Sequence, residues 1–137
     1  MRLARALIKI QSLDEASKAL DTALRRHPRD AALRFERGKL LASGGNREAA
    51  LRDLKAAVQF DPKAAESYLE LSRVLHDVGR TDEQKAALEA AVRIDPNLVE
   101  ARYALANLAR QQGDAEQARE QLAKVRATTL LPHLRSS

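Results

Sequence analysis

Three histidines are the side chains best suited to metal binding or acid–base catalysis, but their spacing supports neither. They are His27, His76 and His133. No two of them stand four residues apart, the spacing that brings two ligands onto one face of a helix, and there is no His-Glu-x-x-His segment. We therefore expect neither a metal ion nor a cofactor.

The sequence also lacks the motifs of an activated nucleophile and of a phosphate-binding loop. The chain has no cysteine, which excludes disulfides, thiolate zinc sites and cysteine nucleophiles. It contains no G-x-S-x-G segment and neither of the two glycine-rich patterns that cradle phosphates. The sequence therefore predicts a protein that is not an enzyme.

Charge is spread unevenly along the chain, whose formal net charge is +5. Successive blocks carry +3 (residues 1–30), +3 (31–64), −3 (65–98) and +2 (99–137). Such an asymmetry can steer a charged partner toward one part of the molecule. The plainer interpretation is a solvated surface on which both signs are interspersed.

No segment of the sequence is typical of a membrane span or a signal peptide. Spanning helices need about 18 or more apolar residues in a row, and no such run exists. Met1 is followed closely by Arg2, Arg5 and Lys9, which leaves no apolar signal-peptide core. We expect a cytoplasmic protein, although the lack of cysteine suits the periplasm equally well. The abundance of arginine and alanine is typical of bacterial proteins.

A period of 34 residues organises the whole chain. Four series of residues repeat at that spacing: one of prolines, one of glycines, one of leucines and one of small residues. Their members are Pro28, Pro62 and Pro96; Gly45, Gly79 and Gly113; Leu20, Leu54, Leu88 and Leu122; and Ala4, Gly38, Ser72 and Ala106. Glycine favours the left-handed conformation in which many helices end, and proline ends one helical hairpin before the next begins. The small residues let paired helices approach closely.

Helical apolar spacing fills the stretches between these glycines and prolines. Residues that follow the glycines supply the expected N-caps, namely Asn46, Thr81 and Asp114. The sequence predicts eight helices, over residues 1–10, 13–26, 31–43, 46–60, 64–77, 81–94, 98–111 and 115–127.

This 34-residue helix–turn–helix unit resembles the tetratricopeptide repeat, or TPR. The resemblance implies an all-α solenoid, a right-handed superhelix of antiparallel helix pairs. It covers one domain over residues 1–127, divided into a partial repeat (1–30) and three further repeats (31–64, 65–98 and 99–127). Arg34, Arg37 and Arg102 depart from the pattern, because the family places aromatic or leucine side chains at these points.

The resemblance also implies a binding surface, because the first helix of each TPR hairpin lines a concave groove. Residues expected to face that groove at equivalent places in the repeat are Arg5, Lys39, Arg73 and Asn107 in one row and Phe35, Leu69 and Tyr103 in another. Arg110 lies beside them, together with Glu70, His76 and Glu100. An acidic and apolar peptide would complement this mixture, and arginine and tyrosine are enriched at binding hot spots.

The expected function is a protein–protein interaction scaffold that holds another protein or a peptide in this groove. One alternative is self-assembly into homo-oligomers through the chain ends. Another is nucleic-acid binding, against which the acidic third block and the 3 % aromatic content argue, because single strands need stacking platforms. Residues 128–137, with Pro132 expected to interrupt them, form a predicted tail that either covers helix 115–127, docks on another copy, or frays.

Overall fold

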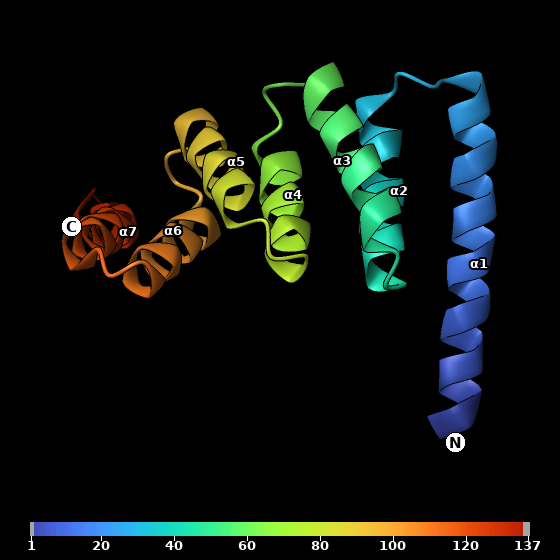
Figure 1. Ribbon diagram of the computed structural model, residues 1–137, viewed down its shortest axis with the longest axis horizontal. Coiled ribbons are helices and arrows are strands. Elements are labelled where there is room, and N and C mark those ends of the chain that lie inside the picture. The colour runs from blue at the N-terminus through green and yellow to red at the C-terminus, as the bar shows by residue number, and fades with distance from the viewer. Residues whose placement is uncertain (1, 136–137) are drawn as a thin grey trace. The chain divides into compact units, whose positions relative to one another are not determined.

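The chain is entirely helical wherever its structure is described. The computed structural model describes the backbone of residues 2–135 and the side chains of residues 4–5 and 9–127. Its helices are α1 (Arg2–Arg26), α2 (Ala31–Ser43), α3 (Arg47–Phe60), α4 (Ala65–Asp77), α5 (Thr81–Ile94), α6 (Val99–Gln111) and α7 (Ala115–Arg135) (Figure 1). The all-α prediction is confirmed, and α2 to α6 agree with their predicted bounds to within one residue.

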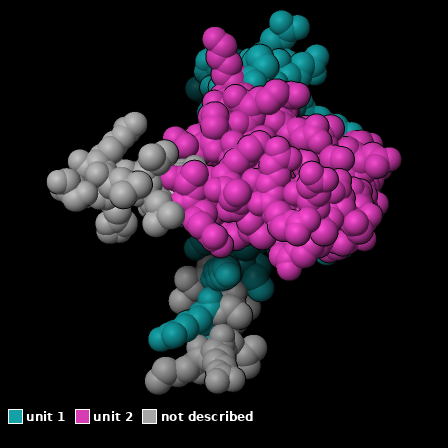
Figure 2. Space-filling model, turned by 90° about the vertical axis from the view of Figure 1, so that its left-hand side faces the viewer, with its two compact units in different colours: residues 1–62 teal, residues 63–137 magenta. Residues whose placement is uncertain are grey.

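Two compact units make up the chain, residues 1–62 and residues 63–137 (Figure 2). Unit 1 contains α1, α2 and α3, with α2 packed against α3 and α1 packed against α2. Unit 2 contains two helical hairpins, α4 with α5 and α6 with α7, and α5 also packs against α6. The right-handed superhelical winding of the whole chain stays a prediction.

Glycine makes the turn inside each hairpin, as predicted. Gly45, Gly79 and Gly113 have φ angles of 83°, 77° and 79°. A side chain is strained in this left-handed conformation, so glycine is the residue that fits. Backbone bonds close the first of these turns, where Gly45 N–H donates to the Ala42 carbonyl and Asn46 N–H to the Leu41 carbonyl.

The predicted helix caps are only partly correct. The Asp114 carboxylate accepts the Gln117 N–H at 3.0 Å and caps α7. Asn46 precedes α3 but makes no side-chain capping bond, and Thr81 is the first residue of α5 and not its cap. Asp30 was not among the predicted caps, yet its carboxylate accepts the Leu33 N–H at 3.1 Å and caps α2.

One continuous helix replaces the first two predicted helices. Residues 1–10 and 13–26 were expected to be separate, whereas α1 runs unbroken from Arg2 to Arg26. Each observed hairpin turn contains a glycine, and residues 11–15 contain neither glycine nor proline. Without a residue that favours the left-handed conformation, the backbone here continues its helical hydrogen bonds.

The last helix is longer than predicted. It was expected to end at residue 127, and it continues to Arg135, past Pro132. Residues 128–135 therefore extend α7, and the expectation that Pro132 interrupts this segment is wrong. Because a single helix does not fold back on itself, they do not cover residues 115–127. Their side chains, and with them any docking on another copy, lie outside the described residues.

Unit 1 depends on a close approach between α2 and α3. A Cβ atom placed on Gly38 would lie 2.7 Å from Leu54 Cγ and 2.9 Å from Leu54 Cδ2. Leu54 is completely buried, so its side chain has no free space into which to retreat. The hydrogen of glycine is what allows this spacing.

The core of unit 2 joins three helices. Leu69 of α4, Leu88 and Ala91 of α5, and Ala101 and Leu105 of α6 form one buried cluster. Burying such aliphatic side chains contributes about 1.5–3 kcal/mol each for the larger ones. The cluster fixes α4 and α6 relative to each other through α5.

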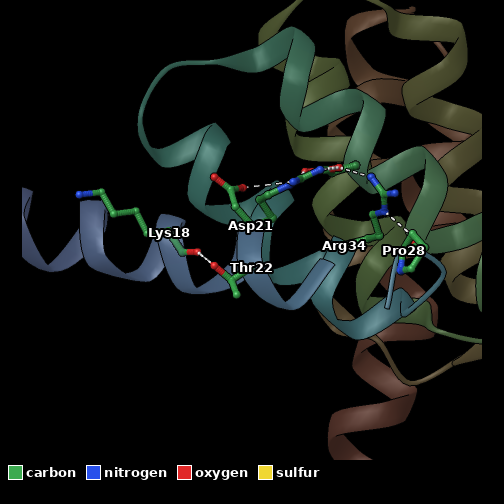
Figure 3. Close-up of polar contacts among 7 residues, drawn as sticks. Lys18, Asp21, Thr22, Pro28 and Arg34 are labelled. Carbon is green, nitrogen blue, oxygen red and sulfur yellow. Dashed lines mark hydrogen bonds and ion pairs between the residues drawn. The ribbon is translucent and has the colours of Figure 1, made fainter. Parts of the chain in front are cut away.

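A charged network ties the three helices of unit 1 together. Asp53 of α3, whose side chain is 4 % exposed, accepts bonds from Arg37 Nε at 2.6 Å and Nη2 at 2.9 Å, and from Arg34 Nη1 at 3.1 Å. Arg37 Nη1 also donates to Asp21 of α1 at 3.2 Å. In Figure 3, Arg34 additionally reaches the Pro28 carbonyl, to which its Nε donates at 3.0 Å.

Unit 2 repeats part of this arrangement without a carboxylate. Arg102 Nε donates to the Pro96 carbonyl at 2.7 Å, and Arg102 Nη1 donates to Gln121 Oε1 at 3.1 Å. Arg102 and Gln121 stand 68 residues after Arg34 and Asp53, two repeats along the chain. At both places where arginine replaces the aromatic residue of the repeat, the second helix of the hairpin supplies a side-chain acceptor. That acceptor is Asp53 for Arg34 and Gln121 for Arg102.

Asp53 has a lowered pKa as a result of its arginine partners. Burial raises the pKa of this carboxyl, but hydrogen bonds from Arg37 and Arg34, together with their charges, lower it further, so that the net pKa lies below the usual value. The pKa of Arg37 is raised, chiefly by its hydrogen bond to Asp53. A carboxyl with a lowered folded-state pKa stabilises the fold above its unfolded-state pKa, and this stabilisation is lost as the pH falls through the folded-state pKa.

Replacing Gly38 with alanine should destabilise the protein. Alanine gains helix propensity over glycine, but the overlap with Leu54 outweighs it, and we expect the free energy of unfolding to fall by about 1–2 kcal/mol. Urea unfolding measures this change. Gly44→Ala is the matched control, because its Cβ would meet only carbonyl oxygens at 3.6 and 3.7 Å. A Gly38→Ala variant as stable as the wild type would contradict the close-approach argument.

Replacing Asp53 with asparagine should destabilise the protein in a pH-dependent way. At pH 7 we expect a loss of about 2 kcal/mol, because two partly buried guanidinium groups lose their counter-charge. As the pH falls below about 4, the usual pKa of an aspartate in an unfolded chain, the wild type progressively loses the same stabilisation, and the two proteins should converge once the pH lies below the lowered folded-state pKa of Asp53. Urea unfolding at neutral and acidic pH measures this, with the exposed Asp14→Asn in α1 as control. A gap that stays constant with pH would show that the carboxylate charge is unimportant.

Candidate functional site

An open pocket in unit 2 is the best candidate for a binding site. It has a volume of about 640 Å³ and lies between α4 and α6, beside the start of α5. The residues that line it are Leu69, Ser72, Arg73, His76, Asp77, Gln84, Glu100, Ala104, Asn107, Leu108, Arg110 and Gln111. The lining of the pocket therefore combines aliphatic side chains with neutral polar, positively charged and negatively charged side chains.

The apolar part of the pocket belongs to the core of the unit. Leu69 and Leu108 are 7 % and 4 % exposed, and Leu69 is a member of the buried cluster that joins α4, α5 and α6. Ser72 is buried beside them, and its hydroxyl donates to the Leu69 carbonyl at 2.6 Å. With its own hydrogen-bond need met inside α4, Ser72 contributes a small neutral surface to the pocket.

Arg73 connects the two helices that line the pocket. Its guanidinium bonds through Nη1 to Glu70 of the same helix and through Nη2 to Glu100 in the first turn of α6. The exposed fractions of the side chains are 49 % for Arg73, 22 % for Glu70 and 67 % for Glu100. Two carboxylates thus neutralise this cation in the structure.

Arg110 provides the second guanidinium of the pocket and is held differently. Its Nη2 donates to Asn107 Oδ1 at 2.9 Å. Among the described residues, no carboxylate forms an ion pair with it. The pocket therefore contains one arginine that is already paired with carboxylates and one that is not.

Four of the predicted groove residues line this pocket, namely Leu69, Arg73, Asn107 and Arg110. The neighbours His76 and Glu100 line it too, as expected from the repeat register. Tyr103 lies outside the lining, on α6, with 49 % of its surface exposed. Asp77 and Gln111 were missed, although they stand 34 residues apart and directly follow His76 and Arg110, so the same period could have found them.

Phe35 and Lys39 belong to unit 1 and interact with each other. Lys39 Nζ lies 4.6 Å from the centre of the Phe35 ring, a cation–π contact on α2. Lys39 also forms an ion pair with Glu36 at 3.4 Å. The two side chains are half-buried, so each presents only part of its surface to a partner.

Arg5 does not have the structural setting that was predicted for it. It was matched to Lys39, Arg73 and Asn107 on the assumption that residues 1–10 form the first helix of a hairpin. Because α1 is continuous, no such helix exists, and Arg5 lies exposed on the first part of α1. The equivalence is wrong for this residue.

A second, smaller pocket in unit 1 surrounds the Asp53 network. It measures about 330 Å³ and is lined by Ser17, Asp21, Arg34, Arg37, Leu41, Ala49, Arg52 and Asp53. Most of its charged groups are bonded to one another, as described above. We assign it a structural role.

Neither a metal centre nor a membrane span is found in the described part of the chain. No group of three or more histidine, aspartate and glutamate side chains there is arranged to hold a metal ion. Within the same residues, no helix combines the length and apolar character needed to cross a membrane.

Solved structures with the same fold include several of the protein MamA. A crystal structure of MamA superposes with a TM-score of 0.79 at 22 % identity, covering 88 % of this chain and 70 % of that one. A structure of MamA from residue 41 to its end, from Desulfovibrio magneticus RS-1, gives 0.77 at 22 % identity, with 93 % and 72 % covered. At this identity the likeness concerns the fold.

Comparison with curated protein sequences gives no significant match. Family models do match. One tetratricopeptide repeat model matches residues 1–65 and again 37–99, and a second matches residues 79–134. Together the matches span residues 1–134 and so cover α1 to α6 and nearly all of α7. The chain belongs to the tetratricopeptide repeat family.

Proposed function

We propose that this chain is a protein-interaction scaffold, without enzymatic activity, that holds a peptide segment of its partner in the pocket of unit 2. The observation that carries the proposal is the pocket itself, an open depression of about 640 Å³ on the facing sides of α4 and α6. These are the first helices of two successive hairpins, the helices that line the groove in this family.

The openness of the pocket favours a segment of a larger molecule over a small ligand. Sites for small molecules enclose most of the surface of what they bind. Here the charged side chains at the rim, Arg73 and Glu100, are about half or more exposed. Such a rim suits several weak contacts to a polypeptide, with the buried leucines below it as an apolar anchor point.

Arg110 is the side chain we expect to contribute most to binding. It carries a charge that no described carboxylate neutralises, and its Nη2 donates a hydrogen bond to Asn107 Oδ1. Arginine is enriched among residues that dominate binding energies.

The other expected functions have less support. Nucleic-acid binding needs a continuous basic path, and Arg73 is occupied by two carboxylates. Self-assembly through the chain ends depends on side chains that fall outside the described residues, in 1–3, 6–8 and 128–137, and stays a prediction. The cytoplasmic location likewise stays a prediction.

Reversing the charge of Arg110 should abolish capture of the partner. We expect wild-type protein to capture a partner from a lysate of the source cell, and Arg110→Glu to retain less than about a tenth of it, because a loss of 1.4 kcal/mol is a tenfold change. Mass spectrometry quantifies the captured protein. Arg119→Glu on the exposed surface of α7 is the matched control, with the same change of charge in the same unit.

Circular dichroism and thermal unfolding must show that both variants keep the wild-type helix content and stability. If Arg110→Glu then captures as much as Arg119→Glu and wild type, the pocket of unit 2 is not the binding site. If both variants lose capture equally, the interaction depends on net charge and not on the pocket.

A further inference from the structure

Glu100 occupies Arg73 in the way that a carboxylate of a bound partner would. The acid comes from α6 and the base from α4, so their bond reaches across the lining of the pocket. Glu70, by contrast, stands three residues before Arg73 on the same helix and is the less exposed of the two acids, at 22 % against 67 %. Glu100 can therefore dissociate from Arg73 more easily than Glu70 can.

Releasing Glu100 costs little. Ion pairs between exposed side chains contribute about 1 kcal/mol or less, because water solvates both charges and the long side chains lose freedom when they pair. An incoming carboxylate replaces one charge-assisted bond with another of the same kind. Meanwhile Glu70 continues to hold the Arg73 side chain in place.

The rest of the pocket favours an acidic ligand over a basic one. With Glu100 displaced, the rim presents Arg73 on α4 and Arg110 on α6, whose Nη2 donates to Asn107 Oδ1. Leu69, Ala104 and Leu108 are the apolar residues of the lining, and they suit aliphatic side chains. Asp77 is the other acid of the lining and Glu70 stays bonded to Arg73, so Arg110 is the cation of the pocket that no described carboxylate pairs with.

We propose that the pocket of unit 2 selects acidic peptide segments that contain aliphatic residues, and that Glu100 is an internal competitor that occupies Arg73 until such a segment binds. This inference rests on the proposed function and specifies the chemistry of the partner. Glu100 thereby sets a threshold, because only a ligand that outcompetes it gains the contact with Arg73.

Removing the charge of Glu100 tests the inference directly. The probe is a fluorescein-labelled peptide of alternating glutamate and leucine, compared with peptides in which glutamine or lysine replaces glutamate, and fluorescence anisotropy gives the dissociation constants. Glu100→Gln should bind the glutamate peptide about three- to fivefold more tightly than wild type, the change that loss of one exposed ion pair permits. The glutamine peptide should show no such gain.

Two matched variants separate the competitor from general charge effects. Glu116→Gln removes an exposed acid from the first turn of α7 and should leave the affinity unchanged. In a chain that already carries Arg73→Gln, adding Glu100→Gln should bring no gain, because the competitor acts only through Arg73. An equal gain from Glu116→Gln, or a gain that persists without Arg73, would overturn the proposal.

The failure of this inference can be told apart from failure of the proposed function. If the lysine peptide binds best and Glu100→Gln weakens it, the pocket binds peptides but selects basic ones. If no peptide binds either protein while Arg110→Glu still loses the captured partner, the pocket is a binding site and the acidic selectivity is wrong. If neither assay depends on the pocket, both proposals fail.

Discussion

Close contact between small and large residues is the constraint on which the rest of this structure depends. In unit 1 the hydrogen of Gly38 faces Leu54, and any side chain there would overlap with the leucine. The equivalent residues of unit 2, Ser72 and Ala106, are buried as well. Small residues thus recur at the same point of the 34-residue period in both units, where a larger side chain has little room.

The pocket of unit 2 follows from that constraint. The buried cluster of α4, α5 and α6 fixes the two pocket-lining helices through the helix between them. Leu69 belongs both to this cluster and to the pocket, so packing and binding share a side chain. The charged residues of the lining are exposed, so a partner can replace their present hydrogen-bond partners. Such a division lets the core set the shape of the site, while rim residues such as Glu100 and Arg110 set the chemistry of what it accepts.

Periodicity in the sequence predicted most of the fold and about half of the pocket. Repeating glycines and prolines located α2 to α6, and the groove register found Arg73, Asn107 and Arg110. The continuous α1 was missed because the register was extended into residues 11–15, which lack the glycine on which every observed hairpin turn depends. Pairing of charges was not predictable either. Arg34 and Arg37 stand out as departures from the family pattern, but their common partner Asp53 lies on the next helix and is identified by distance in space.

Arginine side-chain NMR can show whether this protein binds its partner through the pocket of unit 2. Isotope labelling at Nε gives each arginine its own signal, and adding the captured partner shows which guanidinium groups it contacts. If the partner binds in this pocket, the signals of Arg73 and Arg110 shift together while those of Arg25 and Arg119 stay unchanged. Shifts confined to Arg25, Arg119 or other arginines outside the pocket would place the interaction elsewhere.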